Sequence, residues 1–253
     1  MVEKLKMFVE KDFLQLAKRY LQQRIELGER EIFAVDLIQF PSNPTLNPSP
    51  RGESEGGVRR EKGKGGEGSK LQALYESIRD CQRCLLSKTR TNLVFGVGNP
   101  KASLVFIGEA PGREEDLQGE PFVGAAGQLL TKIIEAIEFK RSEVYITNVI
   151  KCRPPENRNP LLEEIANCEP YLIQQLSIIK PKIICALGTF AAQTLLKTTI
   201  PISLLRGKIH YYQSIKVIPT YHPAALLRNP GWKRQVWEDM KLIKEEFSTE
   251  YNG

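Results

Sequence analysis

The sequence has no long hydrophobic run, since no stretch of about 18 consecutive apolar residues occurs in it. A helix that crosses a membrane needs about that length, so we expect no transmembrane segment and no association with membranes. The first residues, MVEKLKMFVEKDF, lack the apolar core of a secretory signal. No internal repeat is evident either. These absences together predict a cytoplasmic protein in a reducing compartment.

Cysteine is sparse, and its five occurrences need an explanation other than disulfide bonds, which a reducing compartment disfavours. The chain has 253 residues, of which 41% are hydrophobic, enough for one well-formed core. Its formal net charge of +6 is a weak indication of a polyanionic partner and excludes nothing by itself.

Composition divides the chain into three parts. Apolar residues at helical spacing predict an N-terminal helical extension over 1–41, which we expect to bind another protein rather than to catalyse a reaction. Residues 42–70 are rich in Pro, Gly, Ser and charge, which predicts a disordered linker. Residues 71–248 form the main domain.

The main domain alternates short apolar runs with helical patterns. The runs cover 104–109, 144–150, 182–188 and 216–222, and the helical patterns cover 126–138, 161–178, 189–197 and 231–247. Continuous apolar strands separated by helices predict an α/β fold with a parallel sheet covered on both faces. Ligands of such sheets bind beyond the carboxyl ends of the strands. The runs end in or near Glu109, Asn148, Gly188 and His222. We expect these four residues to converge on one site.

Four of the cysteines have the spacing of a metal site. Cys81 and Cys84 form a C-x-x-C motif. Cys152 and Cys168 follow far downstream, in separate segments. Two thiolates held locally and two from distant loops suit zinc or an iron–sulfur cluster, and the spacing alone favours zinc, whereas four unrelated buried thiols are the simpler alternative. Cys185 lies within an apolar run and is expected to be a core residue.

The segment from Val105 to Leu130 is glycine-rich but acidic, which is unusual for a phosphate-binding turn. It matches neither G-x-x-x-x-G-K-[ST] nor G-x-G-x-x-G, so mononucleotide binding is disfavoured. In its second half, PFVGAAGQLL, Gly124 and Gly127 permit close backbone approach at a helix N-terminus. A phosphodiester of a nucleic acid would fit there, with Phe122 stacked on a base. A core position for Phe122 is an equal alternative.

Three motifs together resemble the family 4 uracil-DNA glycosylases, the iron–sulfur members of the uracil-DNA glycosylase superfamily. They are GEAPG…EPFVGAAGQLL, YITNVIKCRPPENRNP and YHPAALL, and the resemblance covers roughly 71–248. It implies a three-layer α/β/α sandwich around a four-stranded parallel sheet. It also implies a [4Fe–4S] cluster, which in this family orders loops that contact DNA, on Cys81, Cys84, Cys152 and Cys168.

The resemblance implies removal of uracil from single- or double-stranded DNA by hydrolysis of the N-glycosidic bond. Asn148 would read the O4 and N3–H edge of uracil, and His222 would stabilise the negative charge that develops near O2. Phe122 would stack on the flipped base, while Glu115 would exclude the methyl group of thymine. From the residues alone, Asn148 could merely close a turn and His222 could be structural.

Three neighbouring residues complete the expected base pocket. Gly108 and Ala110 would line the base, and Ala110 stands where the best-known uracil-DNA glycosylases have an aspartate that positions the water. Glu109 would help to order the site and its water, without a proven role as general base. A dissociative mechanism needs little from such a base.

The segment HPAALLR would form a loop that enters the minor groove of DNA. Leu226 is the first candidate for filling the space left by the flipped base, and Leu227 is the second. Arg228 would meet a phosphate. Further candidates for phosphate contacts, with plain surface positions as the alternative, are Lys151, Arg153 and Arg158.

A related branch of the superfamily forms covalent links to DNA through a histidine on an extra basic loop. His210 lies in a comparable region, but the extended basic insertion is missing and the chain has GEAPG rather than GEQPG. We therefore expect ordinary turnover by a monomer. The alternatives are a non-enzymatic iron–sulfur nucleic-acid-binding module of the same fold and a zinc-stabilised nucleotide-binding protein. Pure binding would not require Asn148 and His222.

Overall fold

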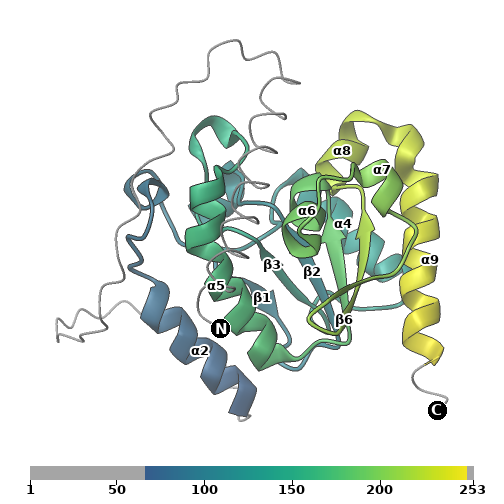
Figure 1. Ribbon diagram of the computed structural model, residues 1–253, viewed down its shortest axis with the longest axis horizontal. Coiled ribbons are helices and arrows are strands. Elements are labelled where there is room, and N and C mark those ends of the chain that lie inside the picture. The colour runs from purple at the N-terminus through teal and green to yellow at the C-terminus, as the bar shows by residue number, and fades with distance from the viewer. Residues whose placement is uncertain (1–65, 250–253) are drawn as a thin grey trace, which may run out of the picture. The chain divides into compact units, whose positions relative to one another are not determined.

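Residues 66–249 are described by the computed structural model of this chain, and Figure 1 shows them as a sheet flanked by helices. Four parallel strands form the centre of the sheet, in the spatial order β3 (Tyr145–Asn148), β2 (Leu104–Gly108), β4 (Ile183–Leu187) and β6 (Ile215–Thr220). All residues of β2, β3 and β4 are buried. Burial on both faces explains why these strands appear in the sequence as continuous apolar runs.

The sheet also has two edge strands that we did not expect. β1 (Val97–Gly98) pairs antiparallel with β3, and β5 (His210–Tyr212) pairs antiparallel with β6. Their lengths are 2 and 3 residues, too short for a periodic pattern to show in the sequence. The expected four-stranded parallel sheet is therefore the core of a mixed sheet in the order β1-β3-β2-β4-β6-β5.

Helices cover both faces of the sheet, which confirms the three-layer α/β/α arrangement. The long helices are α2 (Gly66–Ile78), α4 (Ala125–Ala136), α5 (Leu162–Ile179), α6 (Thr189–Leu196) and α9 (Lys233–Thr249). α2, α5 and α6 share one hydrophobic core with Val105 and Ile107 of β2. α4 and α9 share the second core with Leu104 and Phe106. Alternate residues of one strand thus enter opposite cores, and Figure 1 shows α5 and α9 on opposite sides of the sheet.

Short helical segments make most of the remaining connections. They are η2 (Leu85–Lys88), α3 (Arg113–Gln118), η3 (Pro155–Asn157), α7 (Ile202–Leu205), α8 (Pro223–Arg228) and η4 (Pro230–Trp232). α8 begins directly after β6 because the His222 side chain caps it and a proline occupies its first position. The segment expected to be a minor-groove loop is therefore one short helix.

The folded domain starts earlier than the sequence suggested. α2 begins at Gly66, so residues 66–70, which we assigned to a disordered linker, are helical. Two glycines in the first turn, Gly66 and Gly68, obscured this helix, because glycine disfavours helices. The expected extension over 1–41 and the rest of the linker, 42–65, lie outside the described residues. Within residues 66–249, no helix is long and apolar enough to cross a membrane.

Candidate active site

The carboxyl ends of β2 and β3 place Gly108 beside Asn148, and the two residues are paired in the parallel register. The strand ends are joined further by Val149, whose N–H donates to the Gly108 carbonyl over 2.9 Å. A Cβ on Gly108 would lie 2.4 Å from Asn148 Oδ1 and 2.6 Å from Phe122 Cζ. Contacts below about 3 Å are not tolerated, so only glycine lets the amide and the ring approach this closely.

Asn148 has an unsatisfied acceptor at the centre of this site. Its side chain is 2% exposed, and Oδ1 is the only buried side-chain nitrogen or oxygen of the described residues that lacks a hydrogen-bond partner. An unpaired buried acceptor costs about 1–3 kcal/mol. Such a cost indicates a donor that arrives with a ligand.

Phe122 adopts an unusual backbone conformation next to Asn148. Its φ of 55° lies in the left-handed region, which non-glycine residues seldom occupy. Arg141 Nη2 donates to the carbonyls of Pro121 and Phe122 over 2.8 and 3.0 Å. A Cβ on Gly127 would lie 1.8 Å from the Phe122 oxygen, so only glycine permits this turn. Arg141 belongs to none of the recognised motifs, and sequence reasoning missed it.

Glu115 holds the same turn from the other side. One carboxylate oxygen accepts from the N–H groups of Val123 and Gly124 over 3.0 and 3.1 Å, and the other accepts from Gly112 over 3.1 Å. The Gly112 contact is part of a capping box for α3. The carboxylate that we expected to exclude thymine is therefore held rigidly by three backbone donors.

His222 presents a neutral imidazole to this group. Nδ1 accepts from the Ala224 N–H over 3.1 Å, so the ring proton of the neutral form resides on Nε2, which can donate. Burial lowers the pKa of His222 to about 4, and the positive charge of Arg228 adds to this effect, while Glu115 opposes it. Gly188, with φ 89°, passes closely beneath, since its Cβ would lie 3.0 Å from the His222 Cβ.

Glu109 directly follows β2 and is half-buried. Burial raises the pKa of its carboxyl to about 7. No hydrogen bond or ion pair to this carboxyl occurs within residues 66–249. Ala110 packs at the edge of the first core. Glu109 can thus be charged or neutral near pH 7, which suits a group that handles protons.

Three positions expected to contact DNA are engaged or buried within the protein. The Leu226 side chain is 2% exposed and packs in the second core, so it is not placed to enter a duplex, whereas Leu227 is 50% exposed. Gly124 donates its N–H to Glu115 rather than leaving it for a phosphate, and Gly127 is buried against the Phe122 backbone. Arg228 is exposed at the end of α8, as predicted.

The basic residues near the KCRPP motif are mostly engaged with protein groups. Lys151 is fully buried, which contradicts a phosphate contact. Arg158 forms a 2.6 Å ion pair with Glu164 at the start of α5. Arg153 Nε donates to Asn157 over 2.7 Å. His210 Nε2 lies 2.9 Å from the Leu205 carbonyl oxygen, a structural contact within the β5 region.

The four cysteines of the expected cluster lie near one another. Cys152 interacts electrostatically with Cys81 and Cys84, and Cys168 interacts with Cys84 and Cys152. Burial raises the pKa of Cys168 to about 12 and also raises that of Cys152, so without a cation these groups are thiols. Cys185 is buried in β4, as expected of a core residue.

Hydrogen-bond donors face the sulfur atoms of this group. Arg90 Nη1 donates to Cys152 Sγ over 3.1 Å, and the Lys151 backbone N–H donates to Cys168 Sγ over 3.2 Å. Such donors stabilise metal-bound thiolates. Within residues 66–249, no three His, Cys, Asp or Glu side chains are placed so that they could hold one metal ion. The donors to the sulfur atoms suit thiolate ligands of either a zinc ion or an iron–sulfur cluster.

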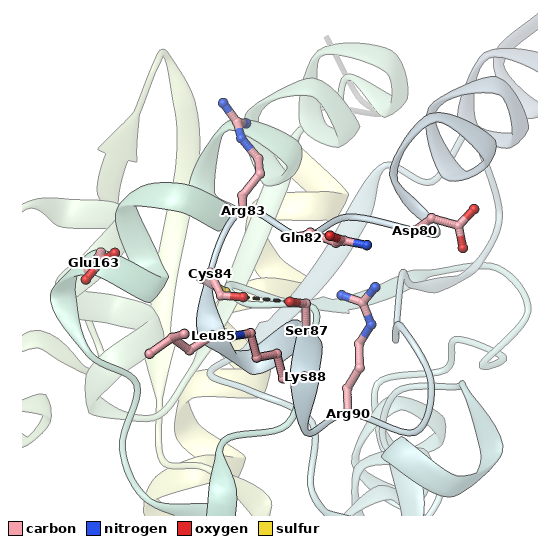
Figure 2. Close-up of a pocket in the computed structure, with 9 residues that line it drawn as sticks. All are labelled: Asp80, Gln82, Arg83, Cys84, Leu85, Ser87, Lys88, Arg90 and Glu163. Atoms are coloured by element: carbon pink, nitrogen blue, oxygen red, sulfur yellow. Dashed lines mark hydrogen bonds between the residues drawn. The ribbon is translucent and has the colours of Figure 1, made fainter. Parts of the chain in front are cut away.

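A pocket of about 500 Å³ adjoins the C-x-x-C motif (Figure 2). Its lining comprises Asp80, Gln82, Arg83, Cys84, Leu85, Ser87, Lys88, Arg90 and Glu163. Ser87 Oγ donates to the Cys84 carbonyl across its floor over 2.8 Å. None of these residues belongs to the group around Asn148. The pocket is therefore separate from the candidate active site, and Cys84 is the one cysteine that lines it.

Comparison with known proteins agrees with this geometry. The family model described as the uracil DNA glycosylase superfamily matches residues 95–241. The chain belongs to this superfamily, as a type-4 uracil-DNA glycosylase relative. Type-4 uracil-DNA glycosylases with similar sequences occur in Archaeoglobus fulgidus, Saccharolobus solfataricus and Thermotoga maritima. Their identities to this chain are 49% over 185 residues, 46% over 188 and 44% over 178.

These glycosylases match the chain over most of their own length. The alignments cover 69%, 71% and 69% of this chain and 92%, 87% and 93% of the respective relatives. The match to the superfamily contains every residue described around Asn148, from Gly108 to Arg228. Cys81 and Cys84 lie before the matched range. The matched range therefore contains the candidate active site and leaves out the C-x-x-C motif.

Proposed function

We propose that this chain is a DNA-repair enzyme that flips uracil out of DNA and hydrolyses its N-glycosidic bond, leaving an abasic site. The observation that carries the proposal is the buried, unpaired Oδ1 of Asn148 beside the ring of Phe122. A planar base with a hydrogen-bond donor on its edge would satisfy both. The relatives named type-4 uracil-DNA glycosylases support uracil as that base.

Asn148 would distinguish uracil from cytosine. Its Oδ1 would accept from N3–H, and its amide nitrogen would donate to O4. Cytosine presents an acceptor at N3 and a donor at its amino group, so both contacts would be mismatched. Each buried mismatch costs on the order of 1–3 kcal/mol, which leaves cytosine in place.

Phe122 and Glu115 would complete recognition. Phe122 would stack on the flipped base, and stacking of this kind contributes about 1–3 kcal/mol per base. Glu115 would stand at C5 of uracil and exclude the methyl group of thymine. Three backbone N–H groups hold its carboxylate, so it could not move aside for the larger base. Gly108 and Ala110 would form the remaining wall.

His222 would supply the main electrostatic stabilisation. As the bond from C1′ to N1 breaks, its electron pair moves to the base, and O2 becomes negative. The neutral imidazole can donate from Nε2 to O2 without first losing a proton. A water molecule then bonds to C1′ of the oxocarbenium-like sugar. We propose that Glu109 in its ionised form positions this water and receives its proton.

A [4Fe–4S] cluster on Cys81, Cys84, Cys152 and Cys168 belongs to the same proposal. The donors that Arg90 and Lys151 direct at the sulfur atoms, together with the type-4 uracil-DNA glycosylase relatives, support it. When bound, it would cross-link the segments that follow α2 and β3 to α5. The steps at the sugar need no electron from it.

Uracil-containing DNA, single- or double-stranded, would bind over the base pocket and contact Leu227 and Arg228. Leu227, which is exposed, takes the place of Leu226 as the side chain that fills the gap in the duplex. Arg228 would meet a phosphate. We further propose that the protein is a monomer in the cytoplasm. Its glycosylase domain would cover residues 71–248, with the first turn of α2, from Gly66, added at its start. The N-terminal extension would bind another protein.

A direct assay tests this proposal. Purified protein that contains iron and shows visible absorption is incubated with labelled DNA carrying one uracil, in single-stranded and in U·G double-stranded form. Alkali then cleaves the abasic sites. We expect cleavage at the uracil in both substrates and none in matched DNA that carries thymine or cytosine instead. Folded, iron-loaded protein that leaves uracil in place would refute the enzymatic function and support a binding module.

A further inference from the structure

Lys151 is a lysine with no exposed surface, located between the cysteine group and the base pocket. Its side-chain Nζ donates to the Asn148 carbonyl over 2.6 Å and to Thr147 Oγ1 over 2.7 Å. Its backbone N–H donates to Cys168 Sγ over 3.2 Å, and Cys152 is the next residue. One residue therefore contacts both a cysteine of the metal site and the residue that reads the base.

The hydrogen bonds of Lys151 join two parts of the molecule. Its side-chain Nζ donates to Thr147 Oγ1 and to the Asn148 carbonyl, so it bridges the last two residues of β3. Its backbone N–H is bonded to Cys168, which lies in α5. One residue thus ties the end of β3 to the cysteine group.

We propose that Lys151 is a positioning residue that couples the four-cysteine site to Asn148. Its backbone N–H bonds to Cys168 and its side chain bonds to the Asn148 carbonyl, so it fixes the position of the main chain at the end of β3. The position of the main chain there determines where the Asn148 amide meets the base. The inference rests on the proposed function, and it gives the cysteine site a second role, which is alignment of base recognition through one side chain.

A double-mutant cycle tests this coupling. Lys151→Met keeps most of the aliphatic length and removes the ammonium. Loss of a partner that orients a site residue typically costs about 10–100-fold, so we expect the single-turnover rate on uracil DNA to fall by that factor. If Lys151 acts through Asn148, the same change in an Asn148→Ala background should cost less than about threefold. If the role of Lys151 were purely structural, Lys151→Met would lower the rate by the same factor in both backgrounds.

A second readout does not depend on catalysis. DNA carrying 2′-fluorodeoxyuridine resists hydrolysis, because fluorine destabilises the oxocarbenium-like state, so binding can be measured alone. We expect Lys151→Met to lose most of the preference for this DNA over its cytosine counterpart, because Asn148 is the residue proposed to distinguish these two bases. Iron content and visible absorption are measured on the same preparations, so that loss of the metal site is seen directly.

Two further variants make the test decisive. Thr147→Val removes one Nζ acceptor without touching a cysteine, and it carries the test if Lys151→Met fails to fold or to hold iron. Arg90→Met is the matched control, since Arg90 donates to Cys152 Sγ but has no contact with Asn148. Arg90→Met should therefore lower the single-turnover rate by the same factor in the unmodified protein and in the Asn148→Ala background.

The outcomes separate the two proposals. Non-additive losses for Lys151→Met or Thr147→Val, with additive losses for Arg90→Met, support the coupling. Additive losses throughout, or unchanged rates and unchanged base preference in iron-loaded Lys151→Met, overturn it while leaving the glycosylase function intact. An unmodified protein that releases no uracil would refute the proposed function itself.

Discussion

The rings of Phe122 and His222 lie next to each other, with centroids 5.4 Å apart and planes inclined by 32°. They come from segments far apart in the sequence, Phe122 from the turn before α4 and His222 from the second position after β6. In the proposed mechanism, a base stacked on Phe122 would have the imidazole close to it. Stacking and charge stabilisation would then depend on the same placement of the base.

The pH dependence of the rate should separate His222 from Glu109. Because the pKa of His222 is lowered to about 4, its imidazole stays neutral above about pH 5 and contributes no change near neutrality. The pKa of Glu109 is raised to about 7, and the ionised form is the active one in our proposal. We therefore expect the single-turnover rate to rise with pH through about 7 and then to level off.

Glu109→Gln is the control for that profile. The variant should lack the rise near pH 7 and have a plateau lower by up to about 100-fold, the lower end of typical general-base contributions. A rise of the same size and midpoint in Glu109→Gln would assign the titration to another group.

Asn148→Asp should lose action on uracil. A carboxylate offers no donor to O4 and repels the negative charge of the departing base, so we expect the rate to fall by about 100-fold or more. The protonated carboxyl can donate to N3 of cytosine and accept from its amino group, so weak release of cytosine is expected. Asn148→Ala should lose uracil without gaining cytosine. Full uracil activity in Asn148→Asp would contradict the recognition scheme.

Gly108→Ala should close the pocket. The new Cβ would lie 2.4 Å from Asn148 Oδ1, so the amide and the Phe122 ring must move apart. We expect kcat/KM to fall by more than about 100-fold, with a loss of about 1–3 kcal/mol in the free energy of unfolding. Gly231→Ala is the matched control, because no atom lies within 4 Å of its added Cβ. Denaturant unfolding and the uracil assay measure the two effects.

Adjacent leucines on α8 should have opposite phenotypes. Leu226→Ala empties part of the core and should lower the free energy of unfolding by about 2–5 kcal/mol. Leu227→Ala should change stability by less than about 0.5 kcal/mol. It should reduce the rate on double-stranded DNA more than on single-stranded DNA, because only a duplex has a gap to fill. Equal effects of Leu227→Ala on both substrates would exclude the wedge role.

The parallel core of the fold was predictable because each of its strands is buried on both faces. Such strands leave continuous apolar runs, and the helices between them are long enough for a clear period. β1, β5 and α8 are too short for any period to appear. The same limit explains the wrong choice of Leu226, since a helix of 6 residues does not reveal which face is buried.

The ends of the buried strands predicted that Asn148 and His222 would meet at one edge of the sheet, and the family resemblance then supplied their expected roles. Lys151 and Arg141 were not identifiable in this way. Lysine is normally exposed, and no local pattern marks the buried Lys151, whose backbone N–H donates to Cys168, which is distant in sequence. Arg141 supports Phe122 from a loop that no motif marks. Contacts between distant segments leave no local signal.

The turn at Phe122 also limits how this pocket can be redesigned. Position 127 accepts only glycine, and Arg141 donates a hydrogen bond to the carbonyl of residue 122. The main chain of this turn therefore cannot move away to enlarge the pocket. Variants that accept bulkier lesions must therefore shorten side chains, either at Phe122 or at Glu115. Shortening Glu115 would also release three backbone N–H groups, so a trimmed Phe122 is the less disruptive starting point for a glycosylase with a wider range of bases.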